Sequence, residues 1–189
     1  AAVEVCVGQQ LDMDFEKAAI VRECEYLRMI ELKTAVLLAS SVKIGAIIGG
    51  ADDKDSDQLY EFGKNLGLAF QIQDDMLDVW GDMKVFGKTS GGDIVANKKT
   101  LPLVKALELA KGTTLKELQK LLSGSDTDPD EKISKVKAIF DELNIKDITE
   151  ILAYDYINKA FGFLQKVNVD ESRKKEMTNL AISLIGRKQ

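Results

Sequence analysis

The chain has 189 residues, of which 45% are hydrophobic and 30% charged, and its formal net charge is −5. This length and balance are typical of a single soluble globular domain, and the acidic charge argues against broad nucleic-acid binding, which needs a basic face. The absence of histidine excludes Ser-His-Asp and Cys-His catalysis, and two cysteines, Cys6 and Cys24, are too few for a disulfide framework or a structural zinc site.

Helical periodicity dominates the first part of the chain, and strand-like alternation is scarce throughout. Residues 1–16 look like the end of a helix, residues 22–48 form one long helical pattern, and residues 55–80 form another. Glycines follow the second and third of these segments, and they favour helix ends at those points.

Residues 81–99 form one long irregular segment that holds four glycines and four lysines. Loops of this length are uncommon in compact domains unless they have a function. Further helices are predicted to begin after Thr100 and after Asp128, each an N-cap with a proline in the first turn. The helical pattern continues to the end, and we predict an all-α fold in which residues 1–189 form a single domain.

No apolar run reaches the roughly 18 residues of a membrane span, and no span is predicted. With no signal peptide and no disulfide framework, the expected location is the reducing, cytoplasmic compartment. The chain begins at Ala1, without Met, in a stretch that already looks helical, which suggests a fragment or a processed product.

The stretch "FQIQDDMLDVWGD" at residues 70–82 sets three carboxylates into an apolar helical pattern. Asp74 and Asp78 are four residues apart and lie on one helix face, whereas Asp75 lies roughly 100° around the helix from Asp74. Such close carboxylates repel one another unless a cation lies between them. Oxygen ligands without His or Cys select a hard ion such as Mg²⁺, which prefers one or two carboxylates plus phosphate oxygens.

The acidic stretch therefore predicts a magnesium site for a phosphorylated ligand. Lys33, in the long helix, and Lys88 and Lys98, in the segment after the acidic helix, supply the complementary positive charge. The alternative is that the acidic residues form an ordinary solvated helix face, and the residues alone leave both interpretations open.

Four stretches together resemble one protein family. They are "GQQLDMDFE" at 8–16, "KTAVLL" at 33–38, "FQIQDDMLD" at 70–78 and "GKTSGGDIVANKKTLPLV" at 87–104. Their order and spacing resemble the G-Q-x-x-D helix, the Lys-Thr helix break, the second aspartate-rich motif and the lysine loop of the trans-isoprenyl diphosphate synthases (polyprenyl synthetases). Farnesyl and geranylgeranyl diphosphate synthases belong to that family.

The resemblance implies an isoprenoid-synthase-type helical bundle and a prenyltransferase reaction. Such enzymes ionise an allylic diphosphate to a carbocation, which the double bond of isopentenyl diphosphate attacks. Mg²⁺ ions neutralise the charge on the departing pyrophosphate, which is electrostatic stabilisation of the transition state. The pyrophosphate is thought to take the proton, so that no histidine base is needed.

The resemblance also implies roles for individual residues. Asp74 would bind metal directly, and Asp75 and Asp78 would help through direct or water-mediated contacts. The residues expected at the reacting centre are Lys33, Thr34, Gln71 and Lys88. Those expected to bind substrate are these four together with Gln9, Asp12, Phe70 and Lys98. Asp93 would either order the lysine loop or support the metals.

The chain departs from the family at its first D-D-x-x-D motif and the two arginines that follow it, because neither is present. We therefore expect the C-terminal portion of a polyprenyl synthetase, with the N-terminal helices absent, only part of the bundle present and the fragment inactive alone. The alternative is a non-catalytic subunit or diphosphate-binding module of a heteromeric prenyl synthase, and terpene cyclisation is a third option. The family resemblance also suggests a homodimer.

Overall fold

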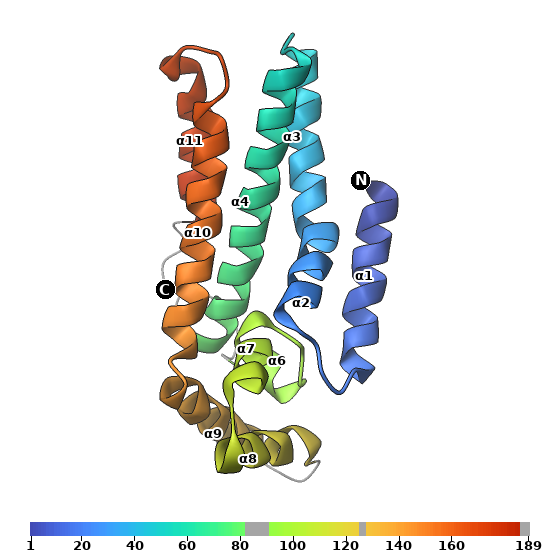
Figure 1. Cartoon of the computed structure of the whole chain (residues 1–189), viewed down its shortest axis with the longest axis vertical. Coiled ribbons are helices and arrows are strands. Elements are labelled where there is room, and N and C mark those ends of the chain that lie inside the picture. The colour runs from blue at the N-terminus through green and yellow to red at the C-terminus, as the bar shows by residue number, and fades with distance from the viewer. Residues whose placement is uncertain (82–90, 125–127, 186–189) are drawn as a thin grey trace.

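The computed structural model describes residues 1–81, 91–124 and 128–185, and these residues form helices without any strand. Long helices lie side by side, and the shorter helices α6–α9 gather at one end of them (Figure 1). The predicted all-α fold is confirmed. Among the described helices, none is both long and apolar enough to cross a membrane.

The first part of the chain forms four α-helices. Their bounds are α1 Ala2–Lys17, α2 Glu23–Ile30, α3 Val36–Ile48 and α4 Asp53–Trp80. The predicted helix over residues 22–48 is interrupted once, because Glu31–Ala35, between α2 and α3, form a π-helical turn. A π turn is rare and frequently occurs at functional sites.

The second part begins with short helices. Their bounds are α6 Gly92–Val95, α7 Leu101–Leu109, α8 Gly112–Ser123 and α9 Pro129–Glu142, and the long helices α10 Ile145–Gln165 and α11 Glu171–Ile185 follow. The predicted N-cap Asp128 is confirmed, because its side chain accepts from the backbone N–H groups of Asp130 and Glu131. Thr100 occupies the N-cap position of α7 without a side-chain capping bond.

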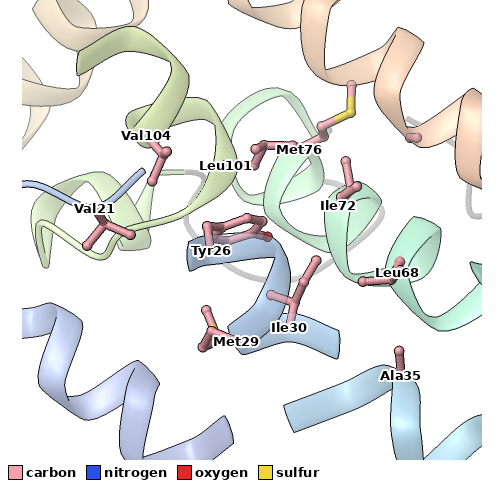
Figure 2. Packing of buried hydrophobic residues seen from close by; sticks show 11 residues of the cluster. Val21, Tyr26, Met29, Ile30, Ala35, Leu68, Ile72, Met76, Leu101 and Val104 are labelled. Carbon is pink, nitrogen blue, oxygen red and sulfur yellow. The ribbon is translucent and has the colours of Figure 1, made fainter. Parts of the chain in front are cut away.

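Within the described residues, the core consists of three clusters of buried apolar side chains, and α4 contributes to each. Leu68, Ile72 and Met76 pack with side chains of α2 and α7, as Figure 2 shows. Val79, near the end of α4, packs with side chains of α6–α9. Phe62, near its start, packs with side chains of α10 and α11. One helix therefore connects every part of the core.

Two glycines allow neighbouring helices to approach the π turn at backbone distance. A Cβ atom on Gly8 of α1 would overlap the backbone N of Lys33. A Cβ atom on Gly67 of α4 would lie 2.6 Å from the Cα atom of Ala35. Because both contacts are made by main chain, the position of the π turn depends on these close approaches.

Candidate active site

The π turn holds Lys33 and Thr34, two residues that the sequence predicted at the reacting centre. Lys33 Nζ forms an ion pair with Asp12 Oδ2 of α1 at 2.6 Å. Thr34 Oγ1 donates a hydrogen bond to Gln71 Oε1 of α4 at 3.0 Å. The turn therefore directs one residue towards each of its two neighbouring helices.

Gln71 extends this contact into a chain of polar groups. Its Nε2 group donates to Asp75 Oδ1, one turn further along α4, at 3.1 Å. Since the amide oxygen accepts from Thr34 and the amide nitrogen donates to Asp75, both ends of the Gln71 side chain are fixed. Thr34, Gln71 and Asp75 therefore act as one oriented unit.

Asp75 is buried and connects three elements, α4, α2 and α7. Its Oδ2 atom accepts from the hydroxyl of Tyr26 in α2 at 2.5 Å and from the backbone N–H of Leu101, the first residue of α7, at 2.9 Å. Figure 2 shows Tyr26 projecting from α2 between α4 and Leu101. Burial raises the pKa of Asp75 to about 6, although the bonds from Tyr26, Leu101 and Gln71 oppose that rise.

The carboxylate of Asp78 contacts the first turn of α6. Asp78 Oδ2 accepts from the backbone N–H of Asp93 at 3.1 Å, and the Asp78 carbonyl accepts from the N–H of Gly91 at 2.7 Å. Burial raises the pKa of Asp78, and the nearby negative charge of Asp93 raises it further. An excess of negative charge therefore collects where α4 meets α6.

Lys98 provides positive charge beside this excess. Its Nζ atom lies 3.4 Å from Asp93 Oδ2. Burial lowers the pKa of Lys98, but the carboxylates of Asp93, Asp75 and Asp12 outweigh burial and raise it overall. Lys98 is therefore protonated at neutral pH. The predicted alternative for Asp93 in which it orders the lysine segment agrees with these contacts.

One narrow pocket collects most of these groups. Lys33 and Lys98 line it from different elements, together with side chains that include Asp12, Gln71 and Asp75. The structure thus brings two of the predicted lysines to one pocket, although they lie far apart in the sequence. Such convergence of charged side chains in a pocket is typical of a functional site.

The three predicted metal ligands do not converge in the same way. Asp74 is exposed and lines a separate depression with Phe70, Gln73 and Leu77, whereas Asp75 is turned into the interior. Within residues 1–81, 91–124 and 128–185, no three acidic or cysteine side chains form a group that could hold a metal ion. The oxygens of Asp75 accept bonds from Tyr26, Leu101 and Gln71, and its metal role, direct or through water, stays a prediction.

Two further predicted residues, Gln9 and Phe70, do not line the pocket. Gln9 is exposed and does not line the pocket, although Asp12, one turn later, does. Lys88 lies outside the described residues, and its predicted role stays a prediction. Phe70 is half-buried beside Asp74, away from the two lysines.

The sequence model of the polyprenyl synthetase family matches residues 1–143. The chain belongs to this family. The short chain isoprenyl diphosphate synthase of Methanothermobacter thermautotrophicus is 37% identical over 174 residues, which make up 92% of this chain and 53% of that relative. A crystal structure of a geranylgeranyl pyrophosphate synthase matches with a TM-score of 0.90 and 39% identity, over 100% of this chain and 58% of the other.

A second solved structure adds information about ligands. The geranylgeranyl pyrophosphate synthase of Corynebacterium glutamicum, complexed with calcium and isoprenyl diphosphate, matches with a TM-score of 0.82 and 29% identity, over 97% of this chain and 56% of that one. The chain spans about half the length of the curated relatives it matches.

Within this polyprenyl synthetase chain, sequence reasoning missed Tyr26 and the backbone N–H of Leu101. Both bind Asp75, but they are 49 and 26 residues away from it along the chain. No local sequence pattern predicts a hydrogen bond between residues so far apart in the chain. Gly8 carried only a weak signal, because some helical glycines mark a packing contact and others, such as Gly162, meet nothing; at Gly8 the structure shows a close approach to the backbone of Lys33.

Proposed function

We propose that this chain forms the diphosphate-binding part of an isoprenyl diphosphate synthase, a transferase that joins isopentenyl diphosphate to an allylic diphosphate. The observation that carries the proposal is the shared pocket of Lys33 and Lys98, with the fixed Thr34–Gln71 pair beside it. Membership of the polyprenyl synthetase family gives this arrangement its chemical context.

The two lysines suit the diphosphate of the allylic substrate. Lys33 now pairs with Asp12 and Lys98 with Asp93, and neither side chain is fully buried. Each ammonium group has three donors, so that it can bind phosphate oxygens while it keeps its carboxylate. The carboxylates hold the ammonium groups in place and raise the pKa of Lys98, which preserves its charge.

Thr34 and Gln71 suit the carbocation that forms when the diphosphate leaves. Their oxygen atoms place the negative ends of dipoles beside the pocket, and the hydrogen bond between them fixes both side chains. Fixed dipoles stabilise developing charge without reorganising during the reaction. Neither group is a strong nucleophile, so that the cation survives until the double bond of isopentenyl diphosphate attacks it.

Asp74 and Asp78 suit a divalent cation. They lie four residues apart on α4, and the pKa of Asp78 is raised by burial and then by the charges of Asp93 and Asp74, a local excess that a cation would offset. Two carboxylates match the preference of Mg²⁺ for a few protein oxygens plus water and phosphate oxygens. When bound there, the ion would stabilise negative charge on the departing diphosphate.

A homodimer in the cytoplasm completes the proposal. Large apolar side chains are exposed on α1 and α3, including Val3, Val7, Leu37, Ile44 and Ile48. Exposed apolar surface of this kind supports association with another subunit. The two cysteines are free and exposed, which suits a reducing compartment. Light scattering at several concentrations measures the association.

Binding and turnover test the proposal separately. By calorimetry, the chain should bind inorganic pyrophosphate in the presence of Mg²⁺, and the double change of Asp74 and Asp78 to Asn should weaken that binding by more than about tenfold. The protein expressed from the complete gene should elongate an allylic diphosphate with isopentenyl diphosphate. Unchanged binding in the double variant would contradict the assigned metal residues.

A second candidate is a non-catalytic, diphosphate-binding subunit. The pocket shared by Lys33 and Lys98 would serve such a subunit equally well, because binding a diphosphate does not require turnover. This candidate predicts pyrophosphate binding by the complete gene product without any chain elongation. Elongation by the complete gene product would eliminate it.

A further inference from the structure

Helix α9 lies outside the pocket, but two of its lysines point into the protein. Lys132 is only 6% exposed, a rare state for a lysine, and Lys137 is half-buried. Lys135, on the same helix, is exposed and pairs with Glu131. A buried ammonium group is retained only where hydrogen bonds compensate its lost hydration. The partners of Lys132 and Lys137 therefore indicate what these residues do.

Lys132 binds the turn that follows α6. Its Nζ atom donates to the carbonyl of Val95 at 3.0 Å and to Oδ1 of Asn97 at 2.7 Å. Asn97 has a left-handed backbone, with φ of 55°, and its Nδ2 group donates to the carbonyl of Leu122 in α8 at 3.0 Å. The side chain of Asn97 is therefore held from two sides by α8 and α9.

The residue after this turn is Lys98. The backbone N–H of Lys98 donates to the Asp93 carbonyl at 3.0 Å, and the Lys98 ammonium group lies 3.4 Å from the Asp93 carboxylate. The direction in which Lys98 leaves the turn depends on the left-handed conformation of Asn97, a region that Asn adopts more readily than most non-glycine residues. The hydrogen bond from Lys132 to the Asn97 side chain holds that turn against α9.

Lys137 holds the end of the acidic helix. Its Nζ atom donates to the carbonyl of Val79 at 2.8 Å, the residue directly after Asp78. Between the two lysines along α9, Ile133 fills the space that a side chain on Gly91 would need, and the N–H of Gly91 donates to the Asp78 carbonyl. Helix α9 thus contacts the backbone directly after Asp78, through Lys137, and the backbone shortly before Lys98, through Lys132.

We propose that Lys132 is a positioning residue, whose ammonium group fixes the Asn97 turn and thereby places Lys98 in the pocket. Lys132 touches no pocket group itself, and it acts through Val95 and Asn97. The consequence of this inference, an effect on diphosphate binding, rests on the proposed function. The effect of Lys132 on the Asn97 turn rests on the contacts alone.

Hydrogen exchange of backbone amides tests the structural part. In Lys132→Met, which keeps the length of the side chain and removes the charge, exchange at Lys98 should become at least about tenfold faster. Exchange at Ala160, in the distant α10 cluster, should stay within about twofold, which separates a local effect from general destabilisation. Lys135→Met is the matched control on the same helix and should change neither amide. Equal acceleration at Ala160, or none at Lys98, would overturn the proposal.

Pyrophosphate binding tests the consequence. Calorimetry with inorganic pyrophosphate and Mg²⁺ should give an affinity about tenfold weaker in Lys132→Met. In a Lys98→Met background, Lys132→Met should weaken the pyrophosphate affinity by less than about twofold, because the ammonium group that Lys132 positions is gone. Equal losses in both backgrounds would refute the coupling. If Lys132→Met proves unstable, Asn97→Gly keeps the left-handed turn, removes its tethers and should show the same dependence on Lys98.

The two levels can fail separately. Absence of any pyrophosphate binding by the unmodified chain would contradict the proposed function, yet the exchange at Lys98 would still decide whether Lys132 holds the turn. Normal binding that Lys132→Met leaves unchanged would overturn the positioning role and leave the proposed function intact.

Discussion

The two lysines of the pocket are held in different ways. Lys33 belongs to a π turn against which α1 and α4 pack through main-chain contacts at Gly8 and Gly67. Lys98 follows a left-handed turn whose Asn97 side chain donates to the backbone of α8, and this turn also accepts hydrogen bonds from Lys132 of α9. Close backbone packing leaves little room for movement, whereas individual side-chain hydrogen bonds can break one at a time. One side of the pocket is therefore rigid, and the other is adjustable.

The largest expected effect comes from breaking the rigid side. In Gly67→Ala the new methyl group would lie 2.6 Å from the Ala35 Cα atom, which forces α4 away from the π turn. We expect a loss of about 3 kcal/mol in the free energy of unfolding, measured by urea denaturation. Gly162→Ala is the control, because its methyl group would meet nothing within 4 Å. It should stabilise the helix by about 0.5–1 kcal/mol, and similar losses in both variants would contradict the packing argument.

Asp75 is connected to both sides of the pocket, through Gln71 to the π turn and through Leu101 to the segment after Lys98. Ionisation of Asp75 should therefore destabilise both sides. Its pKa is about 6 in the folded chain against 3.8 ordinarily. A raised carboxyl pKa contributes stability that is fully present below about pH 4 and is lost as the pH rises through about 6. The unfolding free energy of the wild type relative to Asp75→Asn should fall by about 3 kcal/mol over that range. Urea titrations in metal-free buffer measure this difference, and parallel pH profiles would disprove it.

Tyr26 sharpens the assignment of Asp75. Tyr26→Phe keeps the packing of a fully buried ring and removes the hydroxyl that donates to Asp75. A hydrogen bond to a charged group contributes about 1.5–3 kcal/mol, so that a loss of about 2 kcal/mol is expected in thermal or urea unfolding. Tyr156→Phe, at a half-buried tyrosine, serves as the comparison and should change the stability by less than about 0.5 kcal/mol. If Tyr26→Phe left the unfolding free energy unchanged, Asp75 would no longer be supported as the connection between the two sides of the pocket.

The smallest effect is expected within the π turn itself. Thr34→Val keeps the shape of the side chain and removes the donor to Gln71. A loss of about 1 kcal/mol in unfolding free energy is expected, because one neutral hydrogen bond is lost and Gln71 is less well fixed. Thr34→Ser retains the hydroxyl and should recover most of that loss. Failure of Ser to recover it would mean that the methyl group, not the hydroxyl, matters.

The sequence predicted the parts of this protein that depend on local pattern. The long helices follow from their apolar period, and the cap at Asp128 follows from an acceptor side chain followed by proline. The short helix α6 inside residues 81–99 was not predicted, because four residues give no usable period and glycines dominate the stretch. Its position depends on contacts with α4 and α9, which are tertiary.

The candidate site was predicted in composition more than in arrangement. Lys33, Gln71 and Lys98 line one pocket, and their roles in substrate binding stay predictions. The side on which each aspartate lies was not predictable, because apolar residues surround the aspartates in residues 70–80 and their period does not reveal which helix face is covered. The metal role expected of Asp75 stays a prediction, whereas its bonds from Tyr26 and Leu101, far away in the sequence, were not predicted.

The participation of α4 in all three core clusters has a consequence for how the protein loses its structure. A helix that every cluster shares cannot melt in one part without exposing apolar surface in the others, so that these clusters should open together as one cooperative unit. Heat should therefore dismantle the carboxylates of α4 and the distant α10–α11 packing in a single transition.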